Sequence, residues 1–131
     1  MQRSAQPRAA EESGRCDSGE AVEALESALE RDPQLVDVRA ELGKLYTRQG
    51  RHADAISMLA PVARQMPSDA GVLVHLATSQ RALGLLREAV ASVQQAIEAD
   101  PRRRKAKRLL ADLYADLGDH ETAAKIYEDI V

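Results

Sequence analysis

The sequence repeats itself at a fixed interval of 34 residues. Prolines mark the interval at Pro33, Pro67 and Pro101. Other residue types recur in phases of their own, namely Ala21, Ala55, Ala89 and Ala123, then Gly50, Gly84 and Gly118, then Leu42, Leu76 and Leu110. A period of this length is typical of stacked supersecondary units, each of which buries its apolar face only against its neighbours. The chain is therefore expected to be one short unit copied several times.

The composition is consistent with an array of closely packed helices. The chain has 131 residues, of which 44% are hydrophobic and 30% charged, as expected for a globular protein. It contains no Phe, no Trp and only three Tyr, so Leu, Val, Ile and Ala must do nearly all the packing. The single cysteine, Cys16, excludes an internal disulfide bond.

The sequence has no recognisable targeting or membrane segment. Its first 16 residues lack the apolar stretch that a signal peptide requires, and no stretch approaches the roughly 18 apolar residues of a membrane span. We expect a soluble, cytoplasmic protein with no membrane span, an inference that weakens if the chain is part of a longer one.

Each unit divides into two amphipathic helices. In residues 36–69, Leu42, Leu45 and Tyr46 are spaced as on one face of a first helix, which Gly50 ends. A second helix follows, with its apolar positions at Ala55, Ile56, Leu59, Val62 and Ala63. The pattern predicts a half repeat at 18–35, with the second-helix pattern at 20–31, and repeats at 36–69, 70–103 and 104–131. We interpret residues 1–17 as a mobile tail or the remnant of a truncated repeat.

Three local features depart from the repeat. Pro61 lies inside a second helix, in a slot that Ser27, Gln95 and Asp129 fill elsewhere, so we expect a solvent-facing position and a kink rather than a broken helix. Arg103 occupies the helix-capping slot that Asp69 fills one unit earlier. The array also stops without a polar closing helix, which repeat arrays normally need for solubility.

The first full unit resembles the tetratricopeptide repeat family. It carries Leu42-Gly43, Tyr46, Ala55, Leu59 and Pro67 where that family has its pattern residues. The resemblance covers about residues 20–131 and implies an all-α, right-handed α-solenoid of antiparallel helix pairs, with about three and a half repeats. It implies a protein-protein interaction module that binds a peptide or partner protein, with no enzymatic activity and no cofactor.

Members of this family usually bind a peptide in the concave groove lined by the first helices. Transferred by register, that groove would contain Asp37, Ala40, Glu41, Lys44, Arg48, Val74, His75, Thr78, Arg81, Lys105, Arg108, Leu109 and Asp112. Five of these residues are basic and three acidic, so we expect a slight preference for acidic ligands. The carboxylate clamp of heat-shock co-chaperones is not expected, because Lys105 is the one residue here that matches a position of that clamp.

Residues 102–108 form a basic run, RRRKAKR. The run could bind an acidic peptide, a membrane surface or nucleic acid, but we favour a solvated charge run that Glu98, Asp100 and Asp112 partly neutralise. Nucleic acid is the least expected ligand, because the chain has a net charge of −3 and no aromatic residue lies beside the run to stack on bases.

The sequence offers no catalytic or metal-binding constellation. His52 and His120 occupy the same slot two periods apart and are interpreted as packing residues, while His75 is expected to face the groove. Three interpretations stay open: an interaction module, an array that self-assembles through an apolar end at Ile126, Ile130 and Val131, and the regulatory or targeting part of a longer enzyme. The sequence does not identify the partner.

Overall fold

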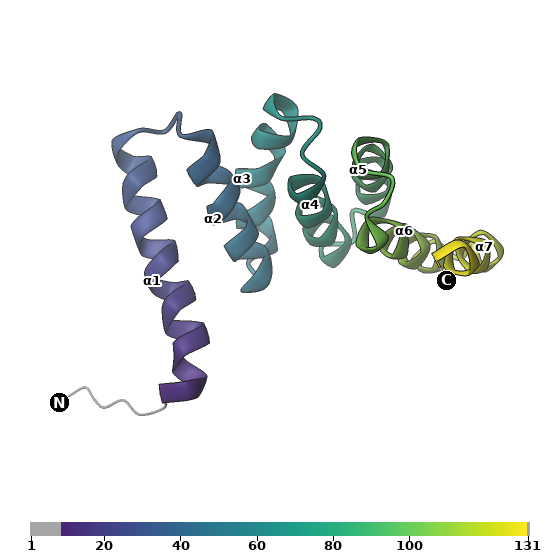
Figure 1. Cartoon of the computed structure of the whole chain (residues 1–131), viewed down its shortest axis with the longest axis horizontal. Coiled ribbons are helices and arrows are strands. Elements are labelled where there is room, and N and C mark those ends of the chain that lie inside the picture. The colour runs from purple at the N-terminus through teal and green to yellow at the C-terminus, as the bar shows by residue number, and fades with distance from the viewer. Residues whose placement is uncertain (1–8, 131) are drawn as a thin grey trace.

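The protein is described here by a computed structural model, which covers residues 9–130, with side chains from Gly19 onward. Within that range it consists of seven α-helices and contains no strand (Figure 1). The helices are α1 (Ala9–Arg31), α2 (Val36–Arg48), α3 (His52–Gln65), α4 (Ala70–Ala82), α5 (Leu86–Ala99), α6 (Arg104–Asp116) and α7 (His120–Ile130). The expected all-α solenoid of helix pairs is confirmed.

The helices form an extended array in which each one packs against the next in the chain, with the two ends far apart (Figure 1). Beyond these neighbours, α2 contacts α4 and α4 contacts α6, whereas the described helices α3 and α5 do not contact each other. The first helices of successive repeats therefore lie closer together than the second helices do. This difference in spacing curves the array, with α2, α4 and α6 on its inner side.

The turn inside each repeat depends on a glycine. Gly50, Gly84 and Gly118 have φ angles of 82°, 82° and 90°, in the left-handed region that side chains with a Cβ rarely adopt. An added Cβ at any of them would meet no atom within 4 Å, so backbone conformation rather than packing selects glycine here. The turn closes the helix as expected, because the amide of Arg51 then donates to the carbonyl of Tyr46 at 2.9 Å.

Small residues allow the paired helices to approach closely. Ala55 and Ala89 are completely buried, and Gly43 lies so close to α3 that an added Cβ would fall 2.5 Å from the Leu59 side chain. The larger core residues are aliphatic, among them Leu42, Leu59, Leu73, Val93 and Leu113. The core therefore runs along the array between the two layers of helices. Apart from Tyr46 its large apolar side chains are aliphatic, as the shortage of aromatic residues predicted.

Two expectations need revision in detail. Helix α1 begins at Ala9, well before the 20–31 segment that the pattern predicts; residues 1–8 of the expected tail lie outside the described part of the chain. Helix α3 continues through Pro61 without breaking, as predicted. Pro61 itself is half-buried, however, whereas its counterparts Ser27, Gln95 and Asp129 are exposed.

Candidate functional site

A pocket of about 610 Å³ lies on the inner side of the array, between α2, α4 and α6. We call it the central pocket. Most of the expected groove residues line it, and Thr47 and Arg103, which register did not predict, line it as well. Its lining residues are Thr47, Arg48, Val74, His75, Thr78, Arg103, Lys105, Arg108, Leu109 and Asp112.

The remaining expected groove residues lie outside the pocket. Glu41 and Lys44 form an ion pair of 3.7 Å one turn before Arg48, and Asp37 lies exposed in the first turn of α2. Ala40 was expected to face the groove but is buried in the core. Its counterpart Val74 is half-buried and does line the pocket, which shows that one repeat slot can differ in exposure along the array.

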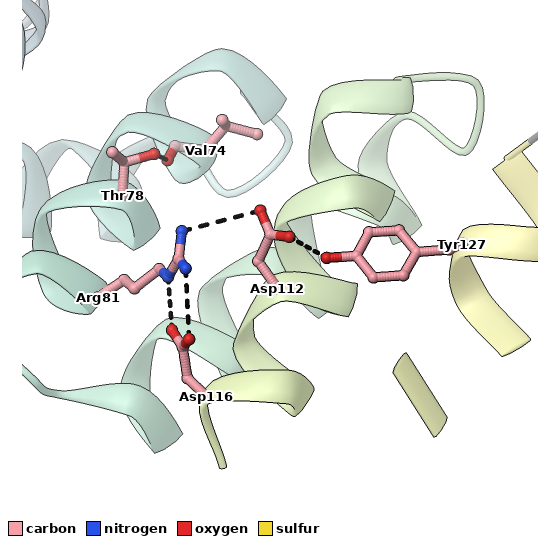
Figure 2. Close-up of polar contacts among 6 residues, drawn as sticks. All are labelled: Val74, Thr78, Arg81, Asp112, Asp116 and Tyr127. Carbon is pink, nitrogen blue, oxygen red and sulfur yellow. Dashed lines mark hydrogen bonds and ion pairs between the residues drawn. The ribbon is translucent and has the colours of Figure 1, made fainter. Parts of the chain in front are cut away.

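Arg81 is directed toward α6 and joins two repeats. Its Nε donates to Oδ2 of Asp116 at 2.6 Å and its Nη2 to Oδ1 at 3.3 Å, while Nη1 lies 3.8 Å from Asp112 (Figure 2). The Tyr127 hydroxyl of α7 donates to Asp112 from the other side. Hydrogen bonding to Asp116 raises the pKa of Arg81, so the guanidinium stays charged. Arg81 thus ties α4 to α6, and its charge is already matched by two carboxylates.

The lining of the central pocket is positive because its basic residues outnumber its single acid, which is also engaged by other side chains. Among the described residues, Asp112 is the one acid that lines the pocket. It accepts a hydrogen bond from the Tyr127 hydroxyl and faces Arg81. The basic lining residues come from two separate helices and the loop before α6. They are Arg48, Arg103, Lys105 and Arg108.

His75 lies half-buried in the wall of this pocket. Its Nδ1 donates to the carbonyl of Gly71 at 2.8 Å, since a carbonyl oxygen can only accept. Burial lowers the pKa of His75, and the cations Lys44, Arg48 and Lys105 lower it further. The imidazole is therefore neutral near pH 7, and its Nε2 is an acceptor.

The start of α6 is built against ordinary helix preferences. Asp69 caps α4 by accepting from the Val72 amide at 3.2 Å, whereas Arg103, in the same slot and with similar extended backbone angles, makes no side-chain cap in this described helix. Cations in a first turn also oppose the helix dipole. Arg103 pairs with Asp100 at 3.6 Å, but Asp112 is engaged by Arg81 rather than by the basic run. Local departures of this kind are expected at functional sites.

The other histidines behave differently from each other. His52 Nδ1 shares a hydrogen bond of 3.0 Å with the hydroxyl of the buried Ser79, which also bonds Thr47 at 3.1 Å. This polar link among α2, α3 and α4 is structural, and sequence register did not predict Ser79. His120 is exposed, so it is not the packing residue that its repeat slot predicts. Within the described residues, no cluster of three or more His, Cys, Asp or Glu side chains could hold a metal ion.

Comparison with known proteins agrees with this architecture. Two family models, both described as tetratricopeptide repeat, match residues 17–74 and 75–131. The chain belongs to the tetratricopeptide repeat family. Among its relatives, the TPR repeat-containing thioredoxin TTL4 of Arabidopsis thaliana is 30% identical over 83 residues, which are 63% of this chain but only 12% of that protein.

Solved structures of proteins named MamA superimpose closely on this chain. MamA of strain AMB-1 is 29% identical, with a TM-score of 0.83 over 91% of this chain and 69% of that chain. MamA from Desulfovibrio magneticus RS-1 has a TM-score of 0.85 over 91% of this chain and 67% of that one, at 21% identity, which supports the fold alone. None of the helices in the described part of the chain is long and apolar enough to cross a membrane.

Proposed function

We propose that this tetratricopeptide repeat protein is a non-enzymatic interaction module that binds an acidic peptide segment of a partner protein in the central pocket. The observation that carries the proposal is the set of basic side chains that α2 and α6 direct toward one pocket, where the single acid is engaged by Arg81. Arg and Lys form charge-assisted hydrogen bonds to carboxylates, which are roughly twice as strong as neutral ones.

The apolar part of the pocket suggests what accompanies the acidic residue. Val74 of α4 and Leu109 of α6 line it together with the basic residues. An aliphatic side chain next to the acid would remove from water the apolar surface that the half-buried Val74 still exposes, which contributes about 25 cal/mol per Å² buried. The proposed ligand is thus an acidic residue adjacent to an aliphatic one.

Charge reversal tests the proposal. Arg48→Glu and Lys105→Glu together should weaken binding of a fluorescent Gly-Ser peptide with a central Asp-Leu pair by at least about tenfold, measured by anisotropy at low salt. Arg87→Glu is the matched control, because Arg87 is an exposed residue of α5 that does not line the pocket. Equal binding by the double variant and the control would contradict the proposal.

Self-assembly through α7 is a second candidate. Tyr127 is 39% exposed, although its repeat counterparts Leu59 and Val93 are completely buried by the helix that follows them. A second copy that covered this face would restore that burial. Sedimentation across a concentration series tests the idea, since a monomer at every concentration would rule it out.

Two further parts of the proposal concern context. A cytoplasmic location is proposed together with the binding function, and cell fractionation tests it. The chain is similar to part of a protein named as a thioredoxin, which supports the alternative that this chain is a regulatory part of a longer enzyme. Reading the coding sequence on both sides of this chain tests whether it belongs to a longer enzyme.

A further inference from the structure

His75 lies where α4 faces α2 and α6, surrounded mainly by positive charge. Lys44 and Arg48 approach from α2 and Lys105 from α6, and all three lower its pKa. Other charged groups also border this region. Glu41 pairs with Lys44, and Arg103, Arg108 and Asp112 line the pocket with His75. On another side of α4, Arg64 lies with Leu73 and Leu76 where α4 meets α3 and α5. A negative group inside this ring of cations would change the environment of the imidazole.

The imidazole has one nitrogen committed and one available. Nδ1 is held by the Gly71 carbonyl, which fixes the ring against α4. Nε2 is the nitrogen left for the pocket. In the neutral ring Nε2 can only accept a hydrogen bond, but in the protonated ring it donates one. A carboxylate, which only accepts, is therefore a partner for the protonated form alone.

We propose that the ligand carboxylate binds beside His75, between Arg48 and Lys105, and that binding is accompanied by uptake of one proton from solvent at Nε2. This inference rests on the proposed function and deepens it. The negative charge of the carboxylate offsets the positive charge of the surrounding cations. The N–H formed at Nε2 of His75 donates a hydrogen bond to this carboxylate. Peptide binding and histidine protonation stabilise each other in the same pocket.

Linkage gives the sign of the pH dependence. If the peptide raises the pKa of His75, a lower pH must raise the affinity for the peptide by the same coupling. The affinity for the peptide is constant at a pH above the pKa that His75 has in the complex. It rises as the pH falls through that pKa, and it levels off below the pKa that His75 has in the free protein. Each unit of change in pKa corresponds to at most about a tenfold change in affinity.

The experiment measures both sides of this coupling on the full chain. We expect the Asp-Leu peptide to bind about three- to tenfold more tightly near pH 5.5 than near pH 8, a range in which its own carboxyl group, with a pKa of about 3.9, stays ionised. NMR titration of the three histidines should show that saturating peptide raises the pKa of His75. The exposed His120 is an internal reference and should not shift.

Variants separate this inference from the proposed function. His75→Asn keeps a donor for the Gly71 carbonyl but cannot titrate, so it should bind the peptide with no pH dependence, whereas the matched control His120→Asn should retain the dependence. Peptide binding that is independent of pH, with His75 unshifted in the wild-type protein, overturns this inference and leaves the proposed function intact. If charge reversal also has no effect, or if the peptide does not bind even at millimolar concentration, both are overturned. The wild-type titration decides the question even if His75→Asn does not fold.

Discussion

Arg81 of α4 and Asp116 of α6, one repeat apart, form a two-point ion pair with N–O distances of 2.6 and 3.3 Å (Figure 2). The register of the repeat places Arg81 on the inner face, but the side chain extends to the next repeat instead of the pocket. The pair fixes how α4 and α6 lie against each other, and these two helices carry most of the central pocket. Arg81 is thus a positioning residue for the groove.

Arg81→Ala should therefore lower the free energy of unfolding by about 1 kcal/mol, since the pair is partly exposed and screened by solvent. Urea denaturation at low salt measures the loss, which should shrink at high salt. Arg87→Ala, on the exposed face of α5, is the matched control and should have little effect. An equal loss in both variants would show that the Arg81 pair contributes nothing specific.

Gly43→Ala should destabilise the protein by about 1–3 kcal/mol because its Cβ would overlap the Leu59 side chain and crowd Met58. Gly71→Ala is the matched control, since the nearest atom to its Cβ, Oδ1 of Asp69, would lie at an ordinary 3.4 Å. There the higher helix propensity of alanine predicts a stability that is equal or up to about 1 kcal/mol higher. Thermal unfolding of the two variants in parallel shows whether the steric cost of an added Cβ or the helix propensity of alanine determines the change in stability at each position.

Arg103→Ser should stabilise α6 by about 0.5–1 kcal/mol. Serine is a preferred capping residue, and the backbone of Arg103 already has the extended conformation that Asp69 uses to cap α4. The substitution also removes the buried Arg103 Nε, which makes no hydrogen bond in the described structure and is paired only with Asp100 at 3.6 Å. Asp69→Ala should have the opposite effect of similar size. Because Arg103 lines the central pocket, we expect the more stable variant to bind the acidic peptide less tightly, as anisotropy would show.

Tyr46 should make stability fall at high pH. Its hydroxyl donates to Glu26 of α1, and burial together with this hydrogen bond raises the pKa of Tyr46 to about 12. The folded state then holds the phenolic proton more tightly than the unfolded state, whose tyrosine titrates near pH 10. The contribution is complete below about pH 10 and is lost as the pH rises toward about 12, by roughly 3 kcal/mol in total. Tyr46→Phe should remove this component from a plot of unfolding free energy against pH; an unchanged slope would contradict the assignment.

Much of the architecture could be predicted from the sequence because an array of this kind depends on local signals. The apolar spacing around Leu42 and Leu59 and the left-handed turn at Gly50 each act within one repeat, so a single 34-residue pattern predicts all three helix pairs. The pattern predicts the start of α1 poorly. Residues 9–19 lack the pattern residues of the repeat, with Glu12 and Cys16 in the slots of Tyr46 and Gly50, yet the helix begins at Ala9.

The candidate site was predictable in part, for a related reason. Register assigns each residue to a face of its helix, and Arg48, His75 and Lys105, which it assigns to the inner face, line one pocket. It does not determine the partner that a long side chain selects on the next repeat. Arg81 was for this reason expected to face the groove, and the polar link through Ser79 was not expected at all.

The sequence by itself therefore determined the repeat, its helices and the inner face on which basic residues gather, since these follow from periodic burial and from backbone conformation at glycine and proline. Tertiary structure decided which charges that face retains. Arg81 is paired with Asp116 and Asp112, Asp112 is held by Tyr127, and His75 is kept neutral by burial and neighbouring cations. These states arise from distances between side chains in different repeats, which a one-dimensional period does not contain.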